Sequence, residues 1–100
     1  MKFVGHTYRH AANAIAVYIA DLRIAAMTAE SIARQYPTSV NLELVRYWND
    51  ALQETDDLVR VIGSYIGQDM GTSARLDFNS LVSRLASQRE SELLKGGQSA

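Results

Sequence analysis

Apolar residues between Ala11 and Tyr36 recur at alternating spacings of four and three, which is the heptad repeat of a long packed helix. The row that keeps this spacing consists of Ala11, Ile15, Tyr18, Leu22, Ala25, Ala29, Ile32 and Tyr36. A second apolar row runs beside it through Ala12, Ile19, Ala26 and Ala33. Two neighbouring rows make a wide apolar face, so the pattern predicts a central helix with helices packed on more than one side.

Turn and capping residues divide the chain into three predicted helices. Thr7 is the predicted N-cap of the first helix, which should run from about Tyr8 to Gln35, because its hydroxyl can accept from a free backbone N–H. Pro37 should end that helix, since the residue before a proline is pushed out of the α region. Gly71 should form the turn between the second and third helices.

The predicted second helix, about Val40 to Ile66, also carries two apolar rows. The first consists of Val45, Trp48, Leu52, Thr55, Val59, Ile62 and Ile66. The second consists of Leu44, Tyr47, Ala51, Leu58, Val61 and Tyr65, with Glu54 interrupting it. Together they predict a broad face that packs antiparallel on the first helix.

The predicted third helix, about Ala74 to Leu94, is apolar only in its first half. Its packed face should consist of Ala74, Phe78, Leu81, Val82 and Leu85. Beyond Ala86 the sequence is polar all round, so we expect the last turns to project into solvent or to meet a partner. Residues 96–100 should form a flexible tail.

These patterns predict an all-α fold, an antiparallel three-helix bundle with two long helices and a shorter third. Residues 1–95 should form one helical domain, because 100 residues suffice for one modest core but not for two. The absence of cysteine and of a signal peptide favours a cytoplasmic protein, and no apolar run approaches the roughly 20 residues that span a bilayer. The net charge of −1 gives no general attraction to nucleic acid or to anionic membranes.

Acidic residues are concentrated in the middle of the chain. Residues 37–66 hold five acidic and two basic residues, whereas residues 1–36 carry a net charge of +2. Helical spacing places most of the former on one face, here called the acidic stripe: Glu43, Arg46, Asp50, Glu54, Asp57 and Arg60, with Asp56 at its edge. Such a face is most often merely solvated. However, Asp50 and Glu54 are like charges four residues apart, which weakens a helix and favours a role in binding.

The candidate partner-binding residues are therefore those of the acidic stripe together with Tyr47, an aromatic side chain of the kind enriched at interfaces. We expect them to dock on a protein or ribonucleoprotein with a basic surface. A self-assembling structural or adaptor protein is an alternative, a homodimer whose predicted interface consists of Val17, Ile24, Met27 and Tyr65. A second alternative is a helix-turn-helix DNA-binding regulator, in which Gly71 would occupy the turn and Arg75, Arg84 and Arg89 would supply the positive charge.

Catalytic and metal-binding functions have little support in the sequence. His6 and His10 share the spacing of a zinc-binding pair, but the third and fourth ligands that zinc needs are absent from their vicinity. The carboxylates of the acidic stripe lie on a convex helix face rather than in a cleft. We therefore expect no catalytic residues, no metal and no cofactor.

The function that these observations favour is non-catalytic and steric: a small helical protein that occupies or bridges a surface of a larger assembly. Compact, cysteine-free helical proteins with an acidic face are frequent among phage-encoded inhibitors of host defence, including anti-CRISPR proteins. The chain is similar to that class in size, composition and charge pattern only, because no sequence motif supports the comparison. In such an inhibitor the acidic stripe would stand in for nucleic-acid phosphates.

Overall fold

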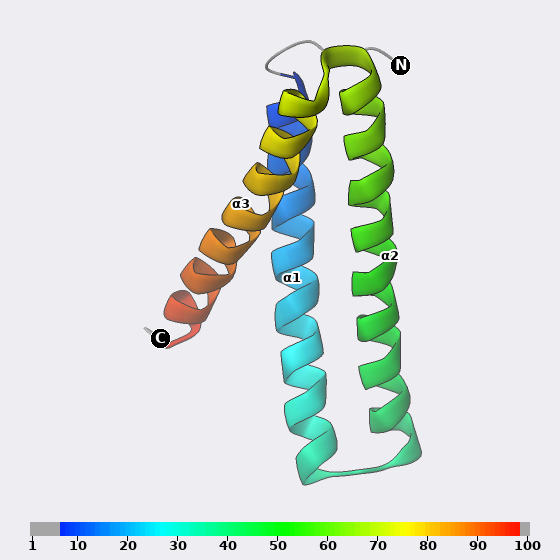
Figure 1. Ribbon diagram of the computed structural model, residues 1–100. Coiled ribbons are helices and arrows are strands. Elements are labelled where there is room, and N and C mark those ends of the chain that lie inside the picture. Colours follow the sequence, from blue (N-terminus) through cyan, green and yellow to red (C-terminus); the bar gives the residue numbers. More distant parts are fainter. Residues whose placement is uncertain (1–6, 99–100) are drawn as a thin grey trace.

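The computed structural model describes residues 7–98, which form three α-helices and no strand. Helix α1 spans Thr7–Gln35, α2 spans Ser39–Met70 and α3 spans Thr72–Gln98. Successive helices run in opposite directions, and each packs against the other two (Figure 1). The predicted all-α three-helix bundle is confirmed. The third helix is the shortest, although at 27 residues it is longer than the sequence indicated.

Local chemistry explains where α1 ends and α2 begins. Pro37 follows the last turn of α1, and Thr38 is the N-cap of α2, where its hydroxyl accepts from the backbone N–H of Asn41 at 3.2 Å. The Asn41 side chain also donates to the carbonyl of Tyr36 at 2.7 Å, which ties the two helix ends together. The predicted N-cap of α1, Thr7, is instead its first helical residue.

Gly71 alone connects α2 to α3. Its backbone N–H donates to the carbonyl of Gly67 at 2.9 Å, and its φ of 98° is a conformation that residues with a Cβ rarely adopt. The chain can therefore reverse within one residue. Helix α3 includes residues 96–98 of the predicted tail, whereas Ser99 and Ala100 lie outside the described residues.

The core is centred on the small-residue row of α1. Ala12, Ile19, Ala26 and Ala33 are all buried, as are Tyr8 and Ala16. The neighbouring row is only partly buried: Leu22 and Ala29 are covered, but Tyr18, Ile32 and Tyr36 are exposed. The prediction that this row forms the central seam was wrong for those three residues. The helix is rotated so that its alanines, which allow close backbone approach, face α2 and α3.

Helix α2 turns its first predicted row inward, where Thr55 and Ile66 are buried and the other members are partly buried. Most of its second predicted row faces solvent, because α1 and α3 both contact α2 on other sides. Exposed side chains of that row are Leu44, Tyr47, Leu58, Val61 and Tyr65. The prediction that both rows pack on α1 was therefore half right.

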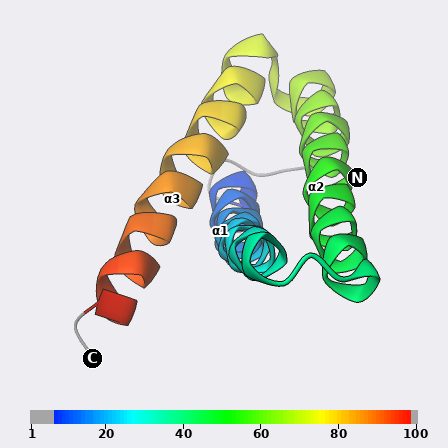
Figure 2. The same cartoon turned by 90° about the horizontal axis from the view of Figure 1, so that it is seen from below.

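Helix α3 covers one side of the α1–α2 pair and slants away from α2 toward its C-terminus (Figures 1 and 2). Phe78, Val82 and Ala86 are its buried residues, and Phe78 and Ile66 are the largest fully buried side chains of the bundle. An ion pair between Arg23 and Glu90, 3.5 Å apart, links α1 to the later turns of α3. The molecule is elongated and thin, 48 × 31 × 16 Å, so much of each helix remains on the surface.

Substitution of two glycines by alanine should have opposite effects on stability. Gly71→Ala should lower the free energy of unfolding by about 1–3 kcal/mol, because alanine is strained at a φ of 98°. Gly96→Ala should raise it slightly, by up to about 0.5 kcal/mol, because Gly96 lies in the last turn of α3 and a Cβ there meets no atom within 4 Å. Urea denaturation followed by circular dichroism measures both. Equal effects of the two substitutions would contradict the assigned turn.

Candidate binding surface

The acidic stripe lies along the solvent-exposed side of α2. All of its members are exposed, and two of its four carboxylates on that side are partly neutralised within the helix. Glu43 lies 3.8 Å from Arg46, and Asp57 lies 4.0 Å from Arg60. Among residues 7–98, neither Asp50 nor Glu54 forms an ion pair. The middle of the stripe is therefore its most strongly negative part.

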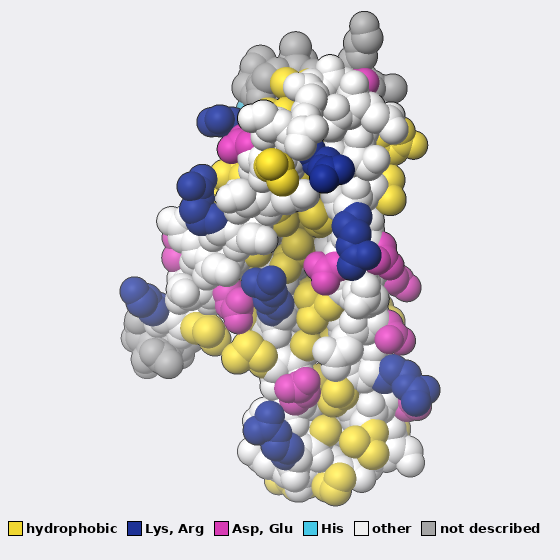
Figure 3. Space-filling model, viewed as in Figure 1, with side chains coloured by type: hydrophobic (Ala, Val, Ile, Leu, Met, Phe, Trp, Pro, Cys, Tyr) yellow, Lys and Arg dark blue, Asp and Glu magenta, His cyan; other side chains and the backbone are white. Residues whose placement is uncertain are grey.

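Asp56 and Arg60 face a different direction from the rest of the stripe. They border an open hollow between the three helices, which also contacts Ile19 and Arg23 of α1 and Val82 of α3. Figure 3 shows this side of the molecule, with charged side chains around an apolar hollow. Glu43, Asp50 and Glu54 lie on the other side of α2. The structure therefore divides the predicted stripe, and its unpaired carboxylates lie on the side of α2 away from this hollow.

Tyr47 is exposed, and its ring contacts Trp48 edge to face with the ring centres 5.0 Å apart. Trp48 itself is partly buried, as expected for a residue of the inward row. Beside Tyr47, an open and largely apolar depression is lined by Ser39, Val40, Glu43 and Leu44. A candidate aromatic anchor and a carboxylate of the stripe thus adjoin one apolar surface.

Most of the exposed apolar residues of α2 form a heptad row, which consists of the second apolar row predicted to pack on α1 together with Val40. We call it the outer row: Val40, Leu44, Tyr47, Ala51, Glu54, Leu58, Val61 and Tyr65. All of its large apolar side chains are 45–69% exposed. The spacing was visible in the sequence, but heptad spacing does not reveal whether the face it generates meets another helix of the same chain.

The residues predicted for a dimer interface do not lie together. Val17 contacts a hollow between α1 and α3 that Leu85 and Arg89 also line, and Ile24 and Met27 follow on the same side of α1. Tyr65 belongs to the outer row of α2. The four side chains therefore belong to two separate surfaces.

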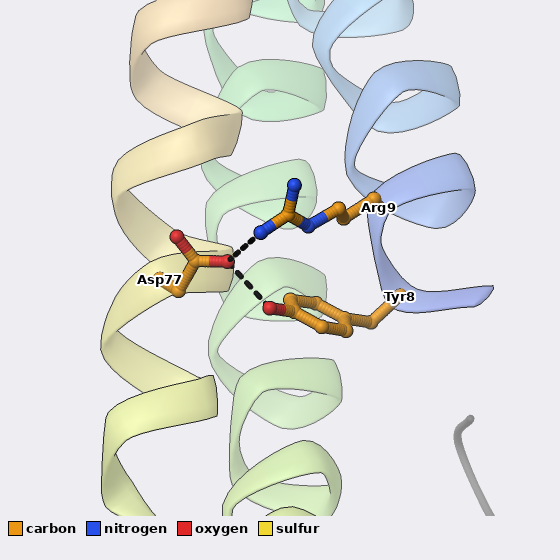
Figure 4. Close-up of polar contacts among 3 residues, drawn as sticks. All are labelled: Tyr8, Arg9 and Asp77. Atoms are coloured by element: carbon orange, nitrogen blue, oxygen red, sulfur yellow. Dashed lines mark hydrogen bonds and ion pairs between the residues drawn. The ribbon is translucent and has the colours of Figure 1, made fainter. Parts of the chain in front are cut away.

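A polar cluster that the sequence did not reveal connects α1 to α3 (Figure 4). The Tyr8 hydroxyl donates to Oδ2 of Asp77 at 2.5 Å, and Arg9 Nη2 lies 3.7 Å from the same oxygen. The polar contact with the Tyr8 hydroxyl, followed by the negative charge of Asp77, raises the pKa of Arg9. The Tyr8 ring is buried whereas Asp77 remains accessible, so the cluster holds the start of α1 against α3.

Candidate metal ligands are sparse in the described part of the chain. No group of three or more His, Asp or Glu side chains in it could hold a metal ion. His10 is exposed, and His6 lies outside the described residues. The hollows are open surface depressions rather than enclosed clefts.

The connection between α2 and α3 differs from that of a helix-turn-helix motif. A single residue connects α2 to α3, whereas the turn of a helix-turn-helix motif has three or four residues.

Comparisons with known proteins provide no family assignment: no family model matches the chain, no curated protein does, and no solved structure does. Within residues 7–98, no helix combines the length and the apolar content needed to cross a membrane. Evidence on function therefore comes from the exposed surface of the three helices.

Removal of the Tyr8 hydroxyl tests the role of the polar cluster. Tyr8→Phe should lower the free energy of unfolding by about 1 kcal/mol, because one hydrogen bond at a partly buried site is lost while the ring still packs. Asp77→Asn should cost less, since the amide oxygen can still accept from Tyr8. Urea denaturation of the three proteins measures the differences. A Tyr8→Phe variant as stable as the wild type would show that the cluster does not hold α1 to α3.

Proposed function

We propose that this protein is a non-catalytic binding protein that attaches to a larger assembly through the exposed side of α2 and acts by occupying that surface. The observation that carries the proposal is the pair of unneutralised carboxylates, Asp50 and Glu54, in the middle of an exposed acidic stripe. Like charges at this spacing cost helix stability, and a basic partner would offset that cost.

The shape of the molecule supports a steric mode of action. A thin bundle of three helices has long exposed sides and only open hollows, so it is suited to covering a surface rather than to enclosing a small substrate. The partner that fits an acidic stripe is a protein or ribonucleoprotein with a basic surface, such as one that normally receives nucleic-acid phosphates. A phage-encoded inhibitor of a host defence complex is the form of this function that we favour.

Charge reversal on the stripe tests the proposal. The variant Asp50→Lys, Glu54→Lys and Asp57→Lys should lose proteins that the tagged wild-type chain captures from a host lysate, by about tenfold or more for each partner, because like charges would then oppose each other. Quantitative mass spectrometry of the captured proteins measures the loss. Added duplex DNA should compete with the same partners for their basic surfaces.

A second charge-reversed variant provides the matched control. Glu92→Lys combined with Ser73→Lys, Ser80→Lys, Ser87→Lys and Ser91→Lys makes the same change in net charge at exposed positions of α3, outside the stripe, and should leave capture unchanged. Circular dichroism establishes that both variants are folded. Equal capture by the wild type and the stripe variant would contradict the proposed function.

A further inference from the structure

The outer row is an apolar strip along α2 that only Glu54 interrupts. From Val40 to Tyr65 it covers 26 residues, which is a rise of about 37 Å along the helix. Its spacing of four and three is the spacing at which side chains of one helix interlock with those of another. The part of the chain that the structure describes places no helix on this strip, since α1 and α3 contact other sides of α2.

Exposed residues of α1 extend this surface. Tyr18, Ile32 and Tyr36 lie on the side of α1 opposite to Ala16 and Val17, which line the hollow with α3. On α2, likewise, the outer row lies opposite to Gly63 and Gly67, whose neighbours are α3 side chains. Both exposed rows therefore lie on the side of the α1–α2 pair that faces away from α3.

The area of this face is large enough for a specific interface. Nine large apolar side chains contribute to it, six from α2 and three from α1, and each is about half exposed. Since a large side chain has roughly 200 Å² of surface, the nine expose on the order of 1,000 Å². One side of a stable protein interface buries about 800 Å². Faces of this size on a single chain usually mark a binding site.

We propose that this face binds an amphipathic helix of the partner whose apolar side is flanked by lysine or arginine. The charges beside the outer row determine the choice of occupant. Glu54 lies within the row, and Glu43, Asp50 and Asp57 each precede one of its members along the same flank. Heptad spacing selects a helix, and the acidic flank selects a basic one. The inference rests on the proposed function, to which it adds the chemistry of the partner.

A second copy of this chain fits the face less well. Antiparallel pairing of two outer rows, with Tyr47 against Leu58, would set Asp50 beside Asp57 of the other copy. Parallel pairing would set Glu54 against Glu54. Pairing of the outer row with α1 of a second copy supplies no basic side chain, because the edge of α1 next to Tyr18 holds Ala14, Asp21 and Thr28. In each arrangement acid meets acid or a neutral side chain.

Two synthetic peptide helices that differ only in charge test the inference. Both carry leucine at heptad spacing, and their remaining positions are lysine in one and glutamate in the other. The fluorescence of Trp48, the single tryptophan of the chain, reports binding because Trp48 contacts Tyr47 of the outer row. The lysine peptide should bind about tenfold or more tightly than the glutamate peptide, and added salt should reduce that preference.

Variants of the face identify the site of binding. Leu58→Ala should weaken both peptides, whereas Met27→Ala, on the opposite side of α1, should weaken neither. Asp50→Lys with Glu54→Lys should reverse the preference in favour of the glutamate peptide. If Leu58→Ala leaves the affinity of both peptides unchanged, or if the two peptides bind the wild type with equal affinity, the inference is overturned. Light scattering that shows a dimer dissociated by Leu58→Ala overturns it as well, because the occupant is then a second copy.

The lysate experiment separates this inference from the proposed function. If both hold, Leu58→Ala should reduce capture of the same proteins that the stripe variant loses. Loss of capture in the stripe variant but not in Leu58→Ala would overturn the amphipathic helix and leave the proposed function standing. Capture that neither variant reduces would overturn both.

Discussion

The packing of this bundle depends on the alanine surface of α1. A helix that contacts two neighbours must let both backbones approach, and Ala12, Ala16, Ala20 and Ala26 provide that space. The apolar volume of the core then comes from a few large residues, chiefly Ile19 and Leu22 of α1, Ile66 of α2 and Phe78 of α3. A core of this kind is narrow. It buries one apolar row on each of α2 and α3 and leaves the remaining apolar rows exposed to solvent.

This economy of packing has a functional consequence. Because the three helices lie in a thin arrangement, the molecule has little interior in which a substrate could be enclosed and long sides on which another macromolecule could lie. The acidic stripe and the outer row are neighbours on the same helix, so charge and apolar contact can act on one partner together. Charge would guide the encounter and set the orientation, and apolar contact would prolong the bound state.

The fold could be predicted from the sequence to a considerable extent. Pro37 and Gly71 divide the chain by backbone chemistry that holds in any context, and the heptad spacing identifies the helices between them. The rotation of each helix could not be predicted. On α1 the row through Tyr18 and the row through Ala12 fit the same period, and only the position of the neighbouring helices decides which is covered. The end of α3 was also predicted too early, because its last turns are polar and Gly-containing, whereas the helix continues to Gln98.

The candidate surface could be predicted only in part, for a related reason. Residues three and four apart share a helix face, so the spacing predicts that Asp50 and Glu54 lie together, and their charge predicts that this face is exposed. The separation of Asp56 and Arg60 from them depends on where α3 lies, and the contact of Tyr8 with Asp77 joins residues 69 positions apart. Neither has a local signal. The exposure of the outer row likewise depends on where the other helices lie, and the sequence pattern of one helix does not give their positions.

The position of Glu54 disfavours the pairing of two copies of this chain through the outer row. An apolar strip of this length at heptad spacing would otherwise pair with any similar strip, including its own copy. A carboxylate in the centre of the strip must lose water whenever an apolar helix covers it, and this costs free energy unless a cation is present. A helix carrying lysine or arginine at that level supplies the cation, whereas a second copy brings another carboxylate. One residue within the outer row thus disfavours self-association and favours the basic partner, and it does so because it interrupts an otherwise continuous apolar surface.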